Sequence, residues 1–424
     1  MTLIDRIEVR EVKAAVVGLG YVGLPLAVEL ARAGYSVVGI DLDADKVAKI
    51  GAGDSYVGDV DSDDLARYVT AGKLAATTDW AALDDCDAVS ICVPTPLRKT
   101  KDPDLSYVME AAKELAAHLH PGMLIILEST TYPGTTEEAV LPALAESGLE
   151  VGRDFFLCFS PERADPGNAL YTTRTIPKVI GGMTPECLKH GVAFYSKALD
   201  HVAPVSSTQV AETVKLLENT FRMINIGLAN EMAVMCDRMG INVWEVIEAA
   251  ATKPFGFMPF YPGPGLGGHC IPVDPHYLSW KIKQTGYEPR FIALASEING
   301  QMPHFVVDKV QAALNGARKA VNGSRIHIMG VAYKRDVSDI RESPALDIIG
   351  LLERLGAQVT FTDPFVAELP SGLRSQPLNP DADCVVVVTD HSETDYKSLF
   401  EQSSLIVDSR NALKDFNDPK IIRL

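Results

Sequence analysis

A glycine-rich motif near the start of the chain constrains the fold more than any other feature. Gly18, Gly20 and Gly23 belong to the segment Gly-Leu-Gly-Tyr-Val-Gly, which fits the pattern GxGxxG. The motif lies between an apolar run at 13–17 and a helical stretch at 24–33. This arrangement is typical of a dinucleotide-binding unit, in which the glycines form a tight turn and admit a pyrophosphate to the helix N-terminus. The alternative is a glycine turn in an α/β domain that binds no ligand.

An acidic residue supports the first interpretation and indicates the cofactor. Asp41 follows the next apolar run, 35–40, and lies 23 residues after Gly18. A carboxylate at this position accepts hydrogen bonds from the ribose hydroxyls and repels a 2′-phosphate. The sequence therefore predicts a site for NAD, with NADP disfavoured.

Apolar runs alternate with helical segments in the first half of the chain and again near its end. Strands are expected at 88–93, 123–127 and 155–159, and a second series at 325–333, 358–361, 384–388 and 405–407. Strands separated by helices form parallel sheets. We therefore expect an α/β protein with two doubly wound Rossmann-like domains, joined by a long central helix and a small helical domain. The expected bounds are 1–205 for the NAD-binding domain, 206–305 for the central helical domain and 306–424 for the second Rossmann-like domain.

The expected central helix begins after Ser206 and Ser207, which are of the residue type that caps helix N-termini. Apolar residues then recur at steps of four and three, at Val210, Val214, Leu217, Phe221, Ile224 and Leu228. This stripe could pack within its own chain or against a second subunit. We expect a homodimer formed through this helix.

Charge and composition exclude several classes of protein. The chain has Lys+Arg 39 and Asp+Glu 56, which gives a formal net charge of -17 and a pI near 5.0. This balance argues against a protein that binds nucleic acids and against one that binds a membrane surface through a polybasic segment. The uncharged run 14–28 is shorter than the roughly 20 apolar residues of a membrane span, and no signal peptide is expected. Seven scattered cysteines without a CxxC pair indicate free thiols in a reducing cytoplasm and no metal site.

One cysteine lies where a structural thiol is not expected. Cys270 lies in the segment Pro-Gly-Pro-Gly-Leu-Gly-Gly-His-Cys-Ile-Pro-Val-Asp-Pro, which begins at Pro262 and includes Asp274. So many Gly and Pro residues predict a rigid loop with exposed backbone N–H groups. A loop thiol in an NAD enzyme indicates covalent capture of an aldehyde, followed by oxidation to a thioester that water can hydrolyse. His269 is interpreted as a structural residue rather than a partner of the thiolate, and the other six cysteines as buried apolar residues.

Three polar residues of the expected central helix share one face, away from the apolar stripe. Lys215, Asn219 and Arg222 fall at i, i+4 and i+7. From spacing alone, this face could equally be a solvated surface.

Together these motifs resemble one family. The glycine motif with Asp41, the segment Thr-Val-Lys-Leu-Leu-Glu-Asn-Thr-Phe around Lys215, the Cys270 loop and the segment 334–344 occur in the order found in the nucleotide-sugar (UDP-glucose/GDP-mannose) dehydrogenase family. The resemblance covers essentially the whole chain. It implies a cytoplasmic enzyme of polysaccharide biosynthesis that oxidises C6 of a UDP-hexose to the carboxylate with two NAD. Segments 160–167 and 269–278 are similar to the branch that acts on N-acetylated sugars. The expected substrate is a UDP-N-acetylhexosamine, foremost UDP-N-acetylglucosamine, with UDP-N-acetylmannosamine, UDP-N-acetylgalactosamine and UDP-glucose as alternatives.

The resemblance also implies catalytic roles. Cys270 matches the nucleophile, and Lys215 with Asn219 matches the pair that stabilises the oxyanion at C6. Asp274 matches the acid that, with the lysine and a water, manages proton transfer.

Two more residues complete the implied catalytic set. Glu162 matches a glutamate that takes part in hydrolysis of the thioester, and Thr131 matches a threonine beside the nicotinamide. The residues implied to bind NAD are Gly18, Gly20, Tyr21, Val22, Gly23, Asp41, Thr95, Thr131 and Arg341. Those implied to bind the UDP-sugar are Glu162, Arg163, Lys215, Asn219, Lys253, Tyr261, Gly265, Gly267, Lys334 and Arg410. The second Rossmann-like domain is thereby the expected UDP-binding domain. The expected partners are the UDP-sugar and a second subunit, with no nucleic acid and no membrane.

The chain departs from the UDP-glucose branch at three places around the sugar. Pro166 occupies the position of a second glutamate, with Asp165 one residue early, and Val273 occupies that of a lysine. Lys253 and Pro254 lie where an arginine from a neighbouring subunit is expected, and Lys253 is the candidate substitute. The departures weaken an assignment to UDP-glucose. A two-electron dehydrogenase of the β-hydroxyacid type and a non-catalytic NAD-binding regulator are the rival functions, and neither requires a catalytic thiol together with a second Rossmann-like half.

Overall fold

A computed structural model describes residues 1–98, 102–164 and 171–424 of the chain, so Asp165 and Pro166 lie outside the described residues. These residues form two compact units. The first unit comprises Met1–Glu218 with His276–Gly286, and the second comprises Asn219–Pro275 with Tyr287–Leu424. Each unit contains a largely or entirely parallel sheet flanked by helices, which confirms the expected α/β class with two doubly wound domains.

An eight-stranded sheet with the order β3-β2-β1-β4-β5-β6-β7-β8 forms the centre of the first unit. Its strands are β1 (Lys13–Val17), β2 (Ser36–Ile40), β3 (Leu74–Thr77), β4 (Ala88–Ile91), β5 (Leu124–Leu127), β6 (Phe156–Phe159), β7 (Lys178–Gly182) and β8 (Val202–Val205). Neighbouring strands are parallel except for β6 and β7, which pair antiparallel. The strand order reverses between β1 and β4, and in doubly wound sheets ligands bind beyond the carboxyl ends of the strands at this point.

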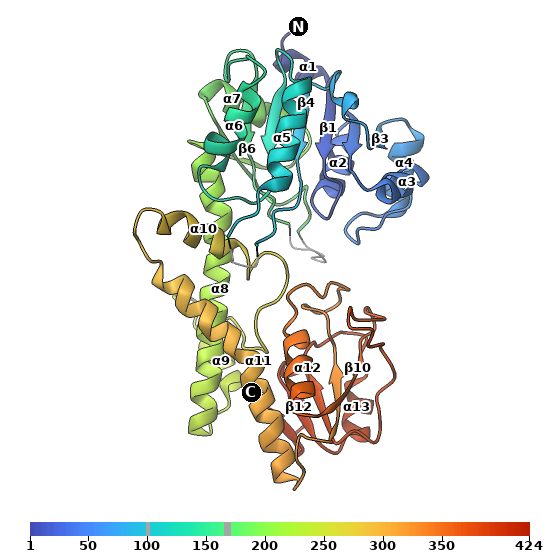
Figure 1. Ribbon diagram of the computed structural model, residues 1–424, viewed down its shortest axis with the longest axis vertical. Helices are drawn as coiled ribbons and strands as arrows, with labels where there is room; N and C mark the ends of the chain where they lie inside the picture. Colours follow the sequence, from blue (N-terminus) through green and yellow to red (C-terminus); the bar gives the residue numbers. More distant parts are fainter. Residues whose placement is uncertain (99–101, 165–170) are drawn as a thin grey trace. The chain divides into compact units, whose positions relative to one another are not determined.

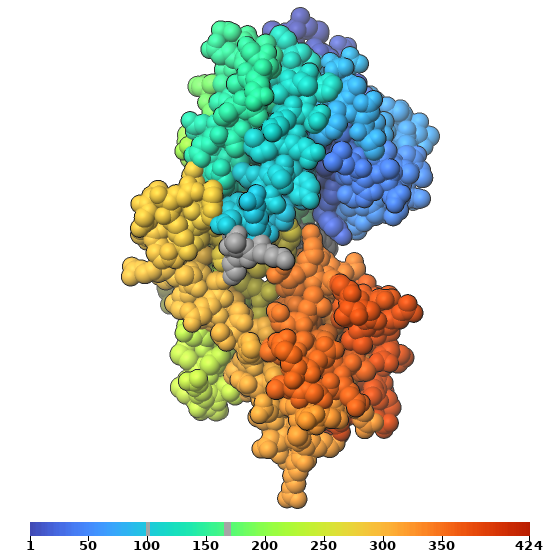
Figure 2. All heavy atoms as spheres, in the orientation of Figure 1, coloured from blue at the N-terminus to red at the C-terminus, as the bar shows by residue number. Residues whose placement is uncertain are grey.

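Helices cover both faces of this sheet. They are α1 (Leu3–Val9), α2 (Gly23–Arg32), α3 (Ala44–Ala52), α4 (Ser62–Thr70), α5 (Ser106–His118), α6 (Leu141–Ala145) and α7 (Pro185–Tyr195), with a 3-10 turn η1 (Trp80–Leu83) and a π-helical turn η2 (Thr136–Val140). Figure 1 shows α5 lying over the sheet beside β4. In the space-filling view of the same orientation, segments coloured blue to green form the visible face of this unit (Figure 2).

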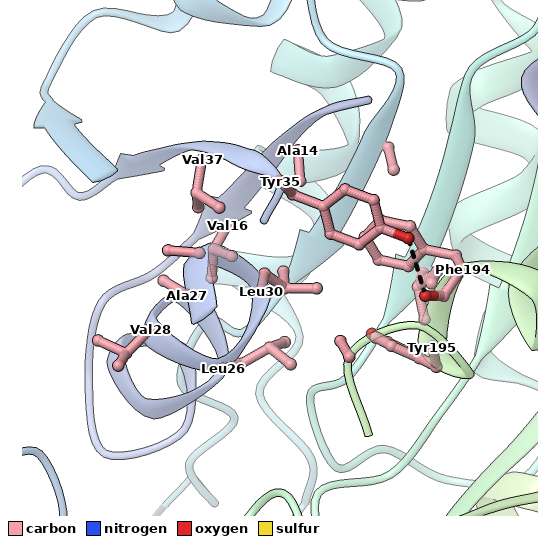
Figure 3. Close-up of a cluster of buried hydrophobic side chains, with 14 of the residues drawn as sticks. Ala14, Val16, Leu26, Ala27, Val28, Leu30, Tyr35, Val37, Phe194 and Tyr195 are labelled. Carbon is pink, nitrogen blue, oxygen red and sulfur yellow. Dashed lines mark hydrogen bonds between the residues drawn. The ribbon is translucent and has the colours of Figure 1, made fainter. Parts of the chain in front are cut away.

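The core around the first strand and helix fixes the glycine turn between them. Leu26 and Leu30 of α2 belong to one buried cluster with Val16 of β1 (Figure 3). In the same cluster Tyr35 stacks on Phe194, with ring centroids 5.1 Å apart, and its hydroxyl donates to the Phe194 carbonyl oxygen at 3.3 Å. Because β1 and α2 are both held by this core, the turn that joins them has little freedom to move.

The second unit combines helices with a smaller sheet. The 32-residue helix α8 (Thr208–Met239) starts in the first unit and continues into the second, where it is followed by α9 (Val243–Ala251) and α11 (Arg290–Gly316). Figure 1 shows α11 crossing α8, and at this crossing the amide of Asn299 donates to the Met223 carbonyl oxygen at 3.1 Å. The short helix α10 (Asp274–Lys283) begins at the end of the Cys270 loop.

The C-terminal sheet is five-stranded and parallel, with the order β10-β9-β11-β12-β13. Its strands are β9 (Arg325–Met329), β10 (Gln358–Thr362), β11 (Cys384–Val387), β12 (Ile406–Asp408) and β13 (Ile421–Arg423), and its helices are α12 (Pro344–Arg354) and α13 (Tyr396–Gln402). No helix among the described residues has the length and apolar character needed to cross a lipid bilayer.

Candidate active site

The glycine turn has the geometry that a dinucleotide site requires. Gly18 adopts φ +88°, and a Cβ there would lie 2.7 Å from the Cys92 carbonyl oxygen. A Cβ on Gly23 would lie 1.8 Å from the Gly18 carbonyl oxygen, whereas a Cβ on Gly20 would meet no atom within 4 Å. Two glycines are therefore required by the fold itself, and Gly20 leaves open the space through which a diphosphate would approach the N-terminus of α2. The residue at the N-cap is Val22, whose side chain cannot cap the helix.

Asp41 lies just beyond the carboxyl end of β2, beside this turn. Its carboxylate accepts hydrogen bonds from the backbone N–H of Leu19 at 2.8 Å and of Asp43 at 3.0 Å. Lys46 lies 3.3 Å from the same carboxylate. These contacts hold the carboxylate at the edge of the turn, and its charge there suits ribose hydroxyls and opposes a 2′-phosphate.

A loop after β5 carries Thr131, whose side chain is fully buried. The hydroxyl of Thr131 has no hydrogen-bond partner among the described residues. Buried hydroxyls without a partner are rare, so this one is suited to a ligand or a water. Glu212 of α8 holds the following turn, because its carboxylate accepts hydrogen bonds from the backbone N–H of Gly134 at 2.5 Å and of Thr136 at 2.9 Å. Burial raises the pKa of Glu212 to about 7.

Glu162 lies in the loop after β6 and is tightly held. One of its carboxylate oxygens accepts hydrogen bonds from the backbone N–H of Arg163 at 2.8 Å and of Ala164 at 2.7 Å. The other accepts a hydrogen bond from Lys178 at 3.2 Å. Burial raises the pKa of Glu162, but Lys178 and the backbone donors outweigh burial and hold this pKa below its usual range. Arg163 itself turns away and forms an ion pair with Glu218.

Helix α8 carries the two polar residues that were expected to act together. Lys215 is buried, and its charge contributes to lowering the pKa of Glu162. Asn219, one helical turn later, is buried and donates a hydrogen bond from Nδ2 to Asp274 at 2.5 Å.

The Cys270 loop presents its thiol to solvent. All seven cysteines lie within the described residues, and Cys270 is exposed while the other six are buried. The Cys270 carbonyl oxygen accepts hydrogen bonds from the backbone N–H of Val273 at 3.1 Å and of Asp274 at 2.8 Å, which closes the turn that begins α10. The chain therefore holds Cys270 and Asp274 one turn apart at the start of this helix.

The same loop packs against the C-terminal domain of the second unit. A Cβ on Gly263 would lie 2.8 Å from the guanidinium of Arg410, and a Cβ on Gly267 would lie 2.7 Å from Tyr333. The backbone N–H of Gly268 donates to the Arg341 carbonyl oxygen at 3.0 Å. Side chains at these glycines would separate the loop from the domain, which explains the glycine content of the loop in steric terms.

The remaining residues expected in the site differ in their exposure. Tyr21 is exposed and Lys253 lies over the Phe255 ring, with its ammonium 5.0 Å from the ring centroid. Tyr261 is half-exposed and stacks on Trp244. Thr95 is buried, and its carbonyl oxygen accepts a hydrogen bond from the Tyr277 hydroxyl at 2.8 Å. Gly265 adopts φ +138°, and Lys334 is half-buried. Arg341 forms an ion pair with Asp339 at 2.6 Å.

The structure divides the expected site residues between the two units. In the first unit lie Gly18, Gly20, Tyr21, Val22, Gly23, Asp41, Thr95, Thr131, Glu162, Arg163 and Lys215. In the second lie Asn219, Lys253, Tyr261, Gly265, Gly267, Cys270, Asp274, Lys334, Arg341 and Arg410.

Sequence reasoning did not identify several polar residues that support these groups. They are Glu128, Lys178 and Tyr195 beside Glu162, Glu212 beside the Thr131 loop, and Asn230 with Asn299 beneath the Cys270 loop. Asn230 accepts a hydrogen bond from the Gly263 backbone N–H at 2.9 Å. The available signal was a charged residue at the start of an apolar strand, as in Pro-Lys-Val-Ile-Gly-Gly, because such a residue requires a buried partner.

Family models match almost the whole length of the chain. The NAD binding domain of the UDP-glucose/GDP-mannose dehydrogenase family matches residues 12–199, its central domain 209–301 and its UDP binding domain 327–415. Together with the glycine turn and the two sheets, these matches define an NAD-dependent nucleotide-sugar dehydrogenase. The chain belongs to the UDP-glucose/GDP-mannose dehydrogenase family, and the expected cofactor, NAD, is confirmed.

Similar proteins in this family act on several sugars. The UDP-N-acetyl-D-glucosamine 6-dehydrogenase of Pseudomonas aeruginosa is 40% identical over 362 residues, which cover 84% of each chain. The UDP-N-acetyl-D-mannosamine dehydrogenase of Pyrococcus horikoshii is 35% identical over 411 residues, 95% of this chain and 96% of that one. A solved structure of the Pyrococcus horikoshii UDP-D-ManNAc dehydrogenase superposes with a TM-score of 0.90 at 33% identity, covering 97% of this chain and 98% of that one.

Proposed function

We propose that this dehydrogenase oxidises C6 of a UDP-N-acetylhexosamine, foremost UDP-N-acetylglucosamine, to the 6-carboxylate in a four-electron reaction through covalent adducts of Cys270. The observation that carries the proposal is the exposure of this one thiol on a glycine-rich loop while the other six are buried. An exposed thiol can react with an aldehyde, whereas a buried one is inert. The 40% identity to a UDP-N-acetyl-D-glucosamine 6-dehydrogenase supports the choice of sugar.

The first oxidation produces an aldehyde and requires removal of a proton. NAD supplies the hydride acceptor for this step and for the second oxidation. Asp274, or a water beside it, takes the proton of the C6 hydroxyl. Cys270 then adds to the aldehyde carbon to give a thiohemiacetal, and Lys215 with Asn219 stabilises the developing oxyanion. The buried position of Lys215 suits this role, because a positive charge attracts a negative charge more strongly where water is scarce.

The second oxidation leaves a thioester, which water must hydrolyse. Glu162 acts as the base that activates this water, and its contacts keep it an ionised carboxylate in a fixed orientation. Thr131 positions the same water or the nicotinamide through its unpartnered hydroxyl. Covalent retention explains how one enzyme completes both oxidations without releasing the aldehyde.

Binding of the two nucleotides follows from the two domains. NAD binds at the turn of Gly18, Gly20 and Gly23 beside Asp41, and the UDP-sugar at the loop and domain that carry Arg410. The residues proposed to contact the UDP-sugar are Arg163, Lys253, Tyr261, Gly265, Gly267, Lys334 and Arg410, and Tyr21, Val22, Thr95 and Arg341 are proposed to contact NAD. The functional domains are 1–205, 206–305 and 306–424, and the enzyme is proposed to work in the cytoplasm.

Helix α8 carries an apolar face that supports a homodimer. Leu217 is 62% exposed, Phe221 45% and Leu228 56%, although all three are large apolar residues on one side of the helix. A contiguous exposed apolar face of this kind marks an interaction surface. We propose that a second copy of the chain covers it. Leu228→Asp is expected to convert the dimer to a monomer in light scattering, whereas Glu231→Ala is not, and a wild-type monomer would contradict the proposal.

Product analysis with a panel of UDP-sugars tests the proposed substrate. The enzyme is incubated with NAD and, separately, with UDP-N-acetylglucosamine, UDP-N-acetylmannosamine, UDP-N-acetylgalactosamine and UDP-glucose, and the acids formed are identified by mass spectrometry. The highest rate is expected for UDP-N-acetylglucosamine. A higher rate for UDP-N-acetylmannosamine would favour the second candidate, which the similarity to the Pyrococcus horikoshii enzyme supports. The formation of no acid from any of these sugars would contradict the proposed function.

A further inference from the structure

A buried charge cluster lies behind Glu162. Lys178, the first residue of β7, forms ion pairs with Glu128 and with Glu162, and its side chain is 4% exposed. The Glu128 side chain is fully buried at the carboxyl end of β5 and accepts a further hydrogen bond from the Tyr195 hydroxyl. The Ser90 hydroxyl lies 3.1 Å from that of Tyr195. One largely buried ammonium thus pairs with two carboxylates, of which Glu128 is fully buried and Glu162 is 12% exposed.

Backbone contacts fix the members of this cluster. The backbone N–H of Lys178 donates to the His201 carbonyl oxygen at 2.8 Å, and that of Glu128 donates to the Ile91 carbonyl oxygen at 2.9 Å. The Lys178 ammonium lies 5.7 Å from the centroid of the Tyr195 ring. Lys178 belongs to β7 and Glu128 directly follows β5, whereas Glu162 lies three residues beyond the end of β6. Two backbone N–H groups hold one oxygen of the Glu162 carboxylate, and Lys178 ties the other oxygen to the sheet.

We propose that Lys178 is a positioning residue for thioester hydrolysis, whose ammonium holds Glu162 as an oriented carboxylate able to take a proton from water. The inference rests on the proposed function, in which Glu162 is the base. In the step, the water oxygen bonds to the acyl carbon, the carbon–sulfur bond breaks and its electron pair goes to Sγ of Cys270. Glu162 takes one proton of the water, and the product is the sugar 6-carboxylic acid.

The protonation of the two carboxylates agrees with this role. Burial raises the pKa of Glu128 above its usual range, whereas the pKa of Glu162 is held below its own. Protonation therefore favours Glu128 over Glu162, and Glu162 keeps its charge near neutral pH. The titratable or charged groups that face Glu162 and Lys178 are Cys92 after β4, Glu128 after β5, Tyr195 of α7 and Lys215 of α8. Burial keeps the pKa values of Cys92 and Tyr195 well above their usual range, so neither group gains charge between pH 5 and 8.

The test compares variants in the hydrolytic step alone. Lys178→Met/Glu128→Gln removes the ammonium without leaving Glu128 charged and unpaired. Glu128→Gln alone is the matched control, because it keeps the pair between Lys178 and Glu162. Each enzyme is mixed with NAD and the UDP-sugar that it oxidises fastest, quenched at intervals, and examined by intact-protein mass spectrometry for an acyl adduct on Cys270.

The double variant is expected to accumulate the adduct and to hydrolyse it at least 10-fold more slowly, since a general base contributes a factor of about 100 to 10,000. The acidic limb of its pH profile for hydrolysis is expected to move to higher pH, while formation of the first NADH is retained. Lys178→Arg, which restores a cation, is expected to recover hydrolysis of the adduct. Glu128→Gln is expected to hydrolyse the adduct without accumulating it. Lys178→Gln/Glu128→Gln serves as the second variant if the first does not fold.

Glu162→Gln separates this inference from the function on which it rests. The adduct could accumulate in Glu162→Gln while the double variant hydrolyses it rapidly with an unchanged pH profile. That result would overturn the role of Lys178 and leave the role of Glu162 standing. Rapid hydrolysis in Glu162→Gln would overturn the assignment of Glu162 as the base, and the inference with it.

Discussion

Substitution of Gly20 by alanine separates the requirements of the cofactor from those of the fold. A Cβ on Gly20 would meet no protein atom within 4 Å, and the residue does not adopt a positive φ. A Gly→Ala change at such a position alters stability by about 1 kcal/mol or less, which shifts the unfolding temperature by roughly 2–4 °C in a domain of this size. The folded protein is therefore expected to tolerate the substitution.

The binding of NAD is expected to respond differently. The methyl group would occupy the space in which the diphosphate approaches the N-terminus of α2, and a charge-assisted hydrogen bond lost there costs about 1.5–3 kcal/mol. At about 1.4 kcal/mol for each factor of ten, the Kd for NAD rises roughly 10- to 100-fold. Isothermal titration calorimetry measures this change, and differential scanning fluorimetry measures stability.

Gly23→Ala is the matched variant with the opposite expectation. Its Cβ would lie 1.8 Å from the Gly18 carbonyl oxygen, so the backbone must shift, and overpacking of this kind costs about 1–3 kcal/mol. It is expected to unfold at a markedly lower temperature. An unchanged Kd for NAD in Gly20→Ala, or equal stability of the two variants, would refute the steric reasoning.

Three further predictions concern the thiol and the dependence of stability on pH. Cys270→Ala is expected to lower the rate of acid formation about 1000-fold or more in assays of the acid product. Cys236→Ala, which removes a buried thiol of α8, is expected to retain that rate. A comparable loss in both variants would contradict the catalytic role of Cys270. Burial lowers the pKa of His327 in β9 to about 4, below its ordinary 6.5. Between these pH values the folded protein binds fewer protons than the unfolded chain. The free energy of unfolding is therefore expected to decrease by about 3 kcal/mol as pH falls from 6.5 to 4. Urea unfolding should show this loss in the wild type and not in His327→Gln, and equal slopes would contradict it. The pKa of Glu212, raised from 4.5 to about 7, has the opposite sign: stability decreases by about 3 kcal/mol as pH rises from 4.5 to 7, and Glu212→Gln should remove that decrease in the same assay. A decrease of the same size in Glu212→Gln would show that another group causes it.

Local sequence patterns were sufficient to predict the fold class. The apolar runs and glycine turn of β1, α2 and β2 depend on neighbouring residues, and the structure places these elements within a residue or two of their expected bounds. The antiparallel pairing of β7 with β6 was not predicted. Strands that alternate with helices lead to parallel pairs, and the described residues between β6 and β7 form turns and loops instead of a helix.

The supporting residues of the site depend on the order of strands in space. Lys178 lies on β7 and Glu128 just after β5. The two residues are 50 positions apart along the chain, and β6 separates their strands in the sheet. No local pattern indicates that they meet. Glu212 presents the same difficulty, because a glutamate on a helix is usually solvated, and its burial follows only from the packing of α8 against the turn at Gly134.

The yield of NADH for each sugar oxidised tests the central claim most directly. The enzyme is given a limiting amount of UDP-N-acetylglucosamine with excess NAD, and the NADH formed is compared with the sugar consumed. Covalent capture by Cys270 followed by a second oxidation predicts two NADH for each sugar and no free aldehyde. One NADH for each sugar would contradict the thioester mechanism and make Cys270 a residue of the loop structure only.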